Sequence, residues 1–408
     1  MSTSVPLHKI KVVLLENIHP RAAALLEDAG YTIERHETAL AGDDLVHAAG
    51  DAHMLGIRSK THLTPDFFDR ANTLWAVGAF CIGTNQIDLA AAGARGVACF
   101  NAPFSNTRSV AEKVICEIIA LHRRLFDRSA QMHKGRWRKS ASNAHEIRGR
   151  TLGIVGYGRI GSQLSVLAES LGMHVLYHDE VQVLPLGNAH QADNLDDLLS
   201  RADVVSLHVP DLAATRNLIT ARELAAMPRG AFLINNSRGS VVNIAHLADA
   251  LASGHLGGAA IDVFPEEPSS NEETFTSPLQ GLDNVILTPH IGGSTVEAQE
   301  NIAVEVGTKL VRLMNNGSTT TAVNLPEVDL PSLHPQHHRL IHVHRNVPGV
   351  LQQINHATAE AGINVAAQYL QSGAETSYMI MDVDQAGSEQ LLQSLRAIPQ
   401  TIRARPIW

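Results

Sequence analysis

The sequence is poor in cysteine, in long apolar runs and in positive charge, and each shortage excludes a class of protein. Its 408 residues include three cysteines, Cys81, Cys99 and Cys116, and no Cys-x-x-Cys pair. A disulfide framework is therefore excluded, and a reducing compartment, the cytoplasm, is expected. No apolar run approaches the roughly 18 residues that a membrane span needs, and the first run, Ile10–Leu15, does not resemble a signal peptide.

Positive charge is the third shortage. Lys and Arg number 32 against 41 Asp and Glu, which gives a formal net charge of −9. Such a chain has no broad positive field for nucleic acid or anionic lipid, so neither partner is expected. An anionic small substrate would need a few local cations to bind it.

What the chain does have is length and regular alternation. At roughly 150 residues per domain, 408 residues predict two to three domains. In the first hundred residues, short apolar runs alternate with helical patterns, which is typical of a parallel sheet covered on both faces. The predicted strands are Ile10–Leu15, Met54–Ile57, Leu74–Val77 and Gly96–Phe100. A long helix is expected from about Ser109, which would act as its N-cap.

The alternation restarts at Thr151 and predicts a second doubly wound sheet. Its six predicted strands are Thr151–Val155, His174–His178, Val204–Leu207, Ala231–Ile234, Gly258–Ile261 and Val285–Thr288. The tail, residues 338–408, has the βαββαβ order of a ferredoxin-like module. The expected fold is therefore α/β, with residues 1–107 and 297–315 in one domain, 108–296 in a second, 316–337 as a linker and 338–408 as the tail.

A glycine motif follows the first strand of the second sheet. Gly156-Tyr-Gly-Arg-Ile-Gly161 has the G-x-G-x-x-G spacing that lets backbone approach a pyrophosphate at a helix N-terminus. Asp179 ends the next strand, where an acid that binds ribose is expected. Asp179 and Glu180 would repel a 2′-phosphate, so NAD is favoured over NADP. A structural turn and a solvated strand end are the alternatives for the two features.

Three segments with unusual polar residues also come directly after predicted strands. These are Asn235–Gly239, Asp262–Pro268 and Thr288–Ser294. Because ligands of doubly wound sheets bind outside the carboxyl ends of the strands, all three segments are expected at the cofactor crevice.

With these segments the chain, tail included, resembles the D-2-hydroxyacid dehydrogenase family, and within it the shorter bacterial, serine-inhibited type. The resemblance implies that Arg238 binds the substrate carboxylate, that Glu267 orients a histidine and that His290 moves the proton. The chemistry agrees, because hydride transfer from an alcohol carbon needs a base for the hydroxyl proton. Arginine offers a bidentate fork for a carboxylate.

The resemblance also assigns NAD-binding residues and reveals two departures from the usual family pattern. The implied cofactor residues are Gly156, Gly158, Arg159, Ile160, Gly161, Asp179, Asn236, Ser237, Asp262, Ile291, Gly292 and Gly293. Asn236 stands where alanine is expected and Asn243 where aspartate is common. Neither departure removes a catalytic group, although Asn236 would touch the nicotinamide pocket.

A second anion site is expected in the first domain. The segments around Arg58, Ser59 and Lys60, around Gly83 and around Asn106 resemble the family's substrate loops, and two cations beside a serine suit a phosphate. Lys60 replaces a more familiar arginine, and a solvated loop is the alternative. By the same resemblance, Trp137 and Lys139 would reach a neighbouring subunit's active site, with an exposed basic loop as the alternative.

The tail resembles an ACT domain, a small module that binds amino acids. By this resemblance His344, Asn346 and Asn364 bind L-serine across a pair of such domains in a homotetramer; turn and strand-start asparagines are the alternative. The histidines between His334 and His344 match no metal-ligand spacing, so no metal is expected.

The implied function is NAD-dependent oxidation of 3-phospho-D-glycerate to 3-phosphooxypyruvate, the first step of L-serine biosynthesis. The implied control is feedback inhibition by L-serine. A side reduction of 2-oxoglutarate to 2-hydroxyglutarate is also expected. Two alternatives stay open: a glyoxylate or hydroxypyruvate dehydrogenase, and an NAD-sensing transcriptional corepressor of the same fold.

Overall fold

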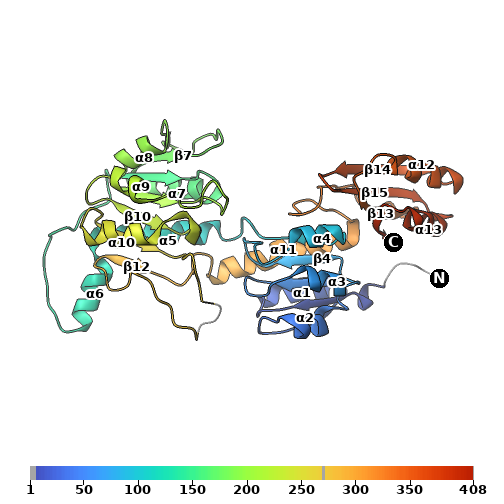
Figure 1. Ribbon diagram of the computed structural model, residues 1–408, viewed down its shortest axis with the longest axis horizontal. Coiled ribbons are helices and arrows are strands. Elements are labelled where there is room, and N and C mark those ends of the chain that lie inside the picture. The colour runs from blue at the N-terminus through green and yellow to red at the C-terminus, as the bar shows by residue number, and fades with distance from the viewer. Residues whose placement is uncertain (1–5, 269–271, 408) are drawn as a thin grey trace. The chain divides into compact units, whose positions relative to one another are not determined.

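The computed structural model describes residues 6–268 and 272–407. The chain divides into two compact units (Figure 1). The first unit combines the residues up to Ser105 with those from Gln299 onward, and the second is Asn106–Ala298. Residues 1 and 408, the outermost predicted domain limits, lie outside the described residues. The predicted domain boundaries stay predictions.

The first unit begins with a five-stranded parallel sheet of order β2-β1-β3-β4-β5. Its strands are β1 (Lys11–Leu14), β2 (Thr32–Arg35), β3 (Met54–Ile57), β4 (Ala76–Ala79) and β5 (Ala98–Phe100). The helices between them are η1 (Leu7–Lys9), α1 (Pro20–Asp28), α2 (Gly42–Ala49), α3 (Pro65–Arg70) and α4 (Leu89–Ala94). The apolar runs predicted four of these strands. β2 was not predicted, because this edge strand is partly exposed and of mixed polarity.

The second unit contains a seven-stranded parallel sheet of order β12-β11-β10-β9-β6-β7-β8. Its strands are β6 (Thr151–Val155), β7 (His174–His178), β8 (His190–Gln191), β9 (Val204–Leu207), β10 (Phe232–Asn235), β11 (Gly258–Ile261) and β12 (Val285–Leu287). Its helices are α5 (Thr107–Arg123), α6 (Leu125–His133), α7 (Arg159–Ser170), α8 (Leu195–Arg201), α9 (Ala221–Ala226), η2 (Gly239–Val241) and α10 (Ile244–Ala252). The two-residue β8 is an addition to the six predicted strands. β6 and β9 are neighbours, but α7, which follows β6, and α9, which follows β9, pack in different cores on the two faces of the sheet. Sheets of this kind bind ligands at such a reversal of strand order.

The start of α5 differs from the sequence prediction. The N-cap is Asn106, without a side-chain capping bond, and the helix begins at Thr107. Ser109, the predicted N-cap, instead lies inside the helix, where its Oγ is 2.8 Å from Thr295 Oγ1. The predicted N-cap was therefore wrong, and the Ser109 hydroxyl instead bonds a tertiary partner.

The tail forms a four-stranded antiparallel sheet of order β14-β15-β13-β16 with two helices on one face. Its elements are β13 (His337–Arg345), α12 (Val350–Glu360), β14 (Val365–Ser372), β15 (Thr376–Asp384), α13 (Ser388–Ala397) and β16 (Thr401–Ile407). The helices pack on the sheet through a core that includes Leu340, Ile354 and Leu391. With two doubly wound sheets and this module, the predicted fold class is confirmed.

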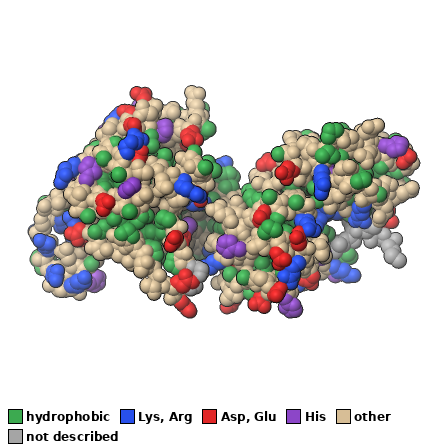
Figure 2. All heavy atoms as spheres, in the orientation of Figure 1, with side chains coloured by type: hydrophobic (Ala, Val, Ile, Leu, Met, Phe, Trp, Pro, Cys, Tyr) green, Lys and Arg blue, Asp and Glu red, His purple; other side chains and the backbone are tan. Residues whose placement is uncertain are grey.

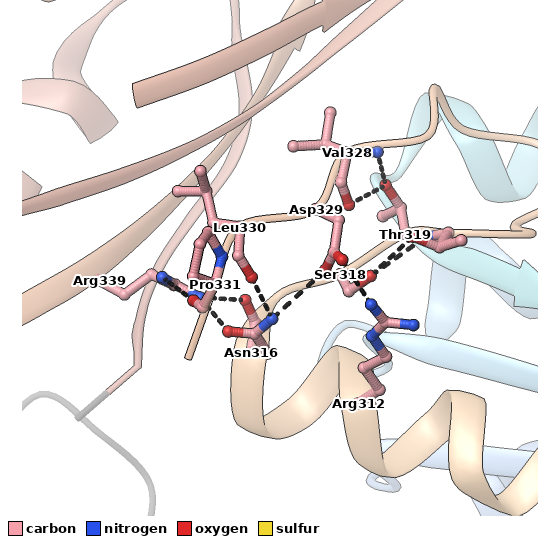
Figure 3. A network of polar contacts seen from close by, with 10 residues as sticks. Arg312, Asn316, Ser318, Thr319, Val328, Asp329, Leu330, Pro331 and Arg339 are labelled. Atoms are coloured by element: carbon pink, nitrogen blue, oxygen red, sulfur yellow. Dashed lines mark hydrogen bonds and ion pairs between the residues drawn. The ribbon is translucent and has the colours of Figure 1, made fainter. Parts of the chain in front are cut away.

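The segment between α11 (Val296–Asn316) and β13 has no regular secondary structure, and polar contacts hold it in place (Figure 3). Asn316 Nδ2 donates to Leu330 O at 2.8 Å. Arg339, which is fully buried, donates to Pro331 O at 2.8 Å and binds both carboxylate oxygens of Asp382, at 2.6 and 2.7 Å. The tail sheet is thereby linked to the end of α11.

Charges of both signs are interspersed on the face in Figure 2, without a broad field of one sign. None of the helices within residues 6–268 and 272–407 is long and apolar enough to cross a membrane. In the same described residues no group of three His, Cys, Asp or Glu side chains is placed to hold a metal ion.

Candidate active site

His290 and Glu267 form an ion pair at the carboxyl end of the second sheet. His290 follows β12 and Glu267 follows β11, and His290 Nδ1 lies 2.8 Å from Glu267 Oε2. Phe264 N donates to the other oxygen, Oε1, at 3.1 Å, which holds the carboxylate in place. Because a carboxylate only accepts, Nδ1 carries the proton and Nε2 of the neutral ring has a lone pair for a substrate proton.

The pair shifts both pKa values in opposite directions. The hydrogen bond to Glu267 raises the pKa of His290 above its usual 6.5, against the opposing effect of burial. Burial raises the pKa of Glu267, but the contacts with His290 and Phe264 N outweigh it, so this pKa is lowered overall. The carboxylate thus stays charged and stabilises the imidazolium that forms when His290 takes a proton.

Asp262 fixes the backbone that carries His290. His290 has a left-handed backbone with φ of 52°, which is strained for a residue with a side chain. Its N–H donates to Asp262 O at 2.8 Å, and the Asp262 carboxylate accepts from Ile291 N at 3.0 Å and from Gly292 N at 2.8 Å. Thr288 Oγ1 donates to the same carboxylate at 2.5 Å. These bonds hold the turn in its strained form.

Arg238 lies on the neighbouring loop, after β10. Asn235 shapes this loop, since its Oδ1 accepts from Ser237 N at 3.1 Å and its Nδ2 donates to Arg238 O at 3.0 Å. A Cβ on Gly239 would lie 2.0 Å from the carbonyl of Phe264, so only glycine lets this loop approach the Glu267 loop so closely. The loops of Arg238, Glu267 and His290 therefore lie side by side at the carboxyl ends of β10, β11 and β12.

The glycine loop fits a dinucleotide. A Cβ on Gly156, whose φ is 93°, would lie 2.4 Å from His208 O, and one on Gly161 would lie 2.3 Å from Gly156 O. These two glycines permit the tight turn and the close packing of α7 on β6. A Cβ on Gly158, the N-cap of α7, would instead enter open space, where a pyrophosphate can approach the helix N-terminus.

Asp179 also contributes to this loop. Its carboxylate accepts from Tyr157 N at 2.7 Å and from Val181 N at 3.1 Å. The acid at the end of β7 is thus bonded to the backbone of the glycine motif. A carboxylate has about four lone-pair sites, so a ribose hydroxyl can bond the remaining ones.

The other predicted cofactor residues lie on the same unit. Arg159 and Ile160 start α7, and Asn236 and Ser237 are buried between β10 and Arg238. A Cβ on Gly293 would meet the Asn106 amide at 2.5 Å, which places this glycine beside a predicted substrate residue. Asn106 is buried, and its Oδ1 has no hydrogen-bond partner among the residues that the structure describes.

The predicted phosphate loop belongs to the first unit, and a residue that the sequence analysis missed shapes it. Glu16, buried after β1, accepts from Arg58 N, Lys60 N and Thr61 N at 3.0, 3.0 and 2.9 Å. The side chains of Ser59 and Lys60 are exposed, and that of Arg58 is partly so. The only signal for Glu16 was an acid at a strand end.

Gly83, the remaining predicted substrate residue, is held beside this loop. Gln86 Nε2 donates to Arg58 O at 2.6 Å and to Gly83 O at 3.3 Å. The structure therefore brings Arg58 and Gly83 together. Trp137 is 80% exposed, and Lys139 is also exposed.

The three predicted effector residues lie in the tail, with His344 and Asn346 near one end of its sheet and Asn364 near the other. Asn346 follows β13, where its Nδ2 donates to Gly373 O at 2.8 Å, while Asn364 precedes β14 and its carbonyl accepts from Asp384 N at 3.2 Å. Gly373 lies in the turn before β15 and Asp384 is the last residue of β15, so the two contacts are separated by the length of this strand, roughly 27 Å at about 3.4 Å per residue. His344 is buried in β13, and burial lowers its pKa.

With this geometry in view, comparisons with known proteins place the chain among its relatives. Residues 115–292 match the NAD-binding domain of D-isomer specific 2-hydroxyacid dehydrogenases, and residues 340–403 match an ACT domain of the type in the small subunit of AHAS. The chain is 55% identical over 403 residues to a D-3-phosphoglycerate dehydrogenase of Escherichia coli, covering 98% of both proteins. The chain belongs to the D-3-phosphoglycerate dehydrogenase family.

Two further likenesses agree with this membership of the D-3-phosphoglycerate dehydrogenase family. A D-3-phosphoglycerate dehydrogenase of Dictyostelium discoideum is 49% identical and covers the whole chain and 99% of its own length. The crystal structure of a D-lactate dehydrogenase from Aquifex aeolicus, complexed with NAD and lactic acid, is 27% identical with a TM-score of 0.64, over 74% of this chain and 95% of its own. The predicted family, the ACT tail and the NAD cofactor are confirmed.

Proposed function

We propose that this protein oxidises 3-phospho-D-glycerate to 3-phosphooxypyruvate with NAD, the first step of L-serine biosynthesis. The observation that carries the proposal is the His290–Glu267 pair, 2.8 Å apart and beside the Arg238 loop. It occurs in a chain 55% identical to a D-3-phosphoglycerate dehydrogenase along nearly its whole length. Bound NAD would supply a hydride acceptor; the glycine loop and Asp179 would hold it.

The protein's own groups would perform the rest of the reaction. Arg238 binds the substrate carboxylate with its guanidinium fork and orients the reacting carbon. His290 Nε2 accepts the hydroxyl proton as the hydride leaves, and Glu267 stabilises the resulting imidazolium. In the reverse direction the imidazolium returns the proton.

Arg58, Ser59 and Lys60 would bind the phosphate of the substrate. The proposal rests on the exposed side chains of this loop and on its three backbone bonds to Glu16. The same cations would bind the second carboxylate of 2-oxoglutarate, which supports a weaker side reduction of 2-oxoglutarate to 2-hydroxyglutarate.

The tail would bind L-serine as the end-product inhibitor. Because Asn346 contacts the turn before β15 and Asn364 contacts the last residue of β15, one tail cannot place both on a single small amino acid. Two tails paired side by side could, which supports the paired ACT domains of a homotetramer. We also place the protein in the cytoplasm, where its three free cysteines stay reduced.

The test is NADH formation from a panel of hydroxyacids, with and without L-serine. We expect kcat/KM for 3-phospho-D-glycerate to exceed that for unphosphorylated D-glycerate by at least about a hundredfold, since the phosphate makes charged hydrogen bonds. Arg58→Ala and Lys60→Ala should each raise KM about tenfold. Lys9→Ala, another exposed lysine, is the control.

Three outcomes would contradict parts of this proposal. Preference for glyoxylate or hydroxypyruvate reduction would favour the alternative dehydrogenase, and absence of turnover with retained NAD binding would favour the corepressor. An unchanged KM in both loop variants would place the phosphate site elsewhere.

A further inference from the structure

A buried polar cluster lies where helix α5 passes the carboxyl ends of β10 and β11. Lys113 and Glu117 are four residues apart on α5 and therefore on one face of the helix. Lys113 Nζ donates to Glu117 Oε1, and the two side chains are only 15% and 4% exposed. Neither residue belongs to the catalytic or cofactor-binding set described above.

The cluster extends into two of the active-site loops. Lys113 Nζ donates to Asn236 Oδ1 at 2.8 Å, and Asn236 Nδ2 donates back to Glu117 Oε2 at 2.6 Å. Lys113 Nζ also lies 3.4 Å from Asp262 Oδ1. The ammonium thus has two hydrogen-bond acceptors, Glu117 on α5 and Asn236 after β10, and an ion-pair partner, Asp262, after β11.

Both loops carry catalytic side chains close by. Asn236 is two residues before Arg238, and Asp262 holds the strained turn of His290 through Ile291 N, Gly292 N and its own carbonyl. The Lys113 ammonium therefore contacts Asn236 in the Arg238 loop and Asp262, which holds the His290 turn.

We propose that Lys113 is a positioning residue: by binding Asn236 and Asp262 at once, it sets the position of the Arg238 loop relative to the His290 loop. The inference rests on the proposed dehydrogenase activity. It also explains the departure at position 236, because the alanine expected there could accept no bond from Lys113.

Electrostatics gives this contact its strength. Burial raises the pKa of Glu117, and the Asp262 carboxylate adds to the increase, whereas the bonds from Lys113 and Asn236 oppose it. Without the ammonium, two carboxylates would share a buried site without a countercharge, which is costly. The loops would then shift to relieve the repulsion, and shifts near 1 Å can cost about a hundredfold in rate.

The experiment compares Lys113→Met, Asn236→Ala and the double variant. Lys309→Met is a matched control, because Lys309 is 14% exposed and also pairs with a glutamate four residues away, Glu305, at 2.8 Å. Lys309 lies on α11 in the first unit, where its Nζ donates to Asn101 O as well as to Glu305. Lys113→Gln, which is neutral but still a donor, serves if Lys113→Met does not fold.

We expect Lys113→Met to lower kcat about tenfold or more with KM for 3-phospho-D-glycerate changed less than about threefold, since the binding groups remain but are misplaced. The double variant should be no slower than the worse single variant, because both substitutions break one contact. Fluorescence titration should show NADH bound about threefold more weakly by Lys113→Met than by Lys309→Met.

Two results would overturn the inference. One is a kcat for Lys113→Met within about twofold of the Lys309→Met value. The other is a double variant in which the losses of kcat from the two single substitutions multiply. If the wild type oxidised no phosphoglycerate, the proposed function would fail, and the NADH titration would still decide the role of Lys113.

Discussion

At the residue scale, His290 combines an unfavourable backbone with a favourable side-chain partner. Its φ of 52° is held by Asp262, and its ring is held by Glu267. A strained residue persists only where the surrounding bonds determine its conformation, and here the bonds from Asp262 and Glu267 do so.

The first prediction concerns the acid limb of the pH profile. Oxidation needs neutral His290, whose pKa is raised by Glu267, so activity should fall as the pH drops through this raised pKa. Glu267→Gln removes the charge and should lower the pKa of His290, which moves the acid limb to lower pH. It should also lower kcat about a hundredfold, because the imidazolium loses its partner.

Rates measured across pH in both directions would check this. Reduction needs protonated His290, so in Glu267→Gln its alkaline limb should move to lower pH as well. Glu266→Gln, the adjacent acid, is the control. An acid limb that stays in place in Glu267→Gln would contradict the assigned pair.

At the scale of elements, local sequence patterns predicted the buried strands well and the helix start poorly. Apolar runs such as Leu152–Val155 are enclosed in a parallel sheet, so their composition alone indicates burial. Ser109 matched a capping pattern, yet Thr295, 186 residues away, bonds its hydroxyl. The strands β2 and β8 lack apolar runs because each lies at an edge of its sheet.

The second prediction concerns the contact between β13 and β15. Arg339 and Asp382 form a buried bidentate pair. Arg339 also donates to Pro331 O in the segment after α11 (Figure 3). Arg339→Met would leave the Asp382 carboxylate buried without a countercharge, which should lower the free energy of unfolding of the tail by about 3–5 kcal/mol.

Thermal unfolding of the full chain would measure this effect. The control is Arg312→Met, since Arg312 pairs with Asp329 at the surface and should contribute about 1 kcal/mol or less. Equal losses of stability in the two variants would contradict a special role for the buried pair.

At the scale of the whole molecule, the proposed L-serine site would be completed by a second copy of the chain. Asn346 contacts the turn before β15, and Asn364 contacts Asp384, the last residue of β15. A shared L-serine site would therefore take one asparagine from each of two chains.

Complementation between variants gives the third prediction. Asn346→Ala and Asn364→Ala should each abolish inhibition by L-serine when expressed alone. In a mixed oligomer, one paired site would have both substitutions and the other neither, so partial inhibition should return. The control is Asn188→Ala in the other unit, a variant that L-serine should still inhibit. Mixed oligomers that L-serine does not inhibit would contradict a site shared between chains.

The sequence by itself determined the fold class, the glycine loop and the strand-end positions of Arg238, Glu267 and His290. Strand periodicity and glycine spacing are local properties, and a parallel sheet converts strand ends into neighbours. Only the tertiary structure decided that Glu16 shapes the Arg58 loop, that Ser109 bonds Thr295, and that Lys113 connects two active-site loops. These contacts join residues tens to hundreds of positions apart, and the folded backbone alone brings their polar atoms within hydrogen-bonding distance.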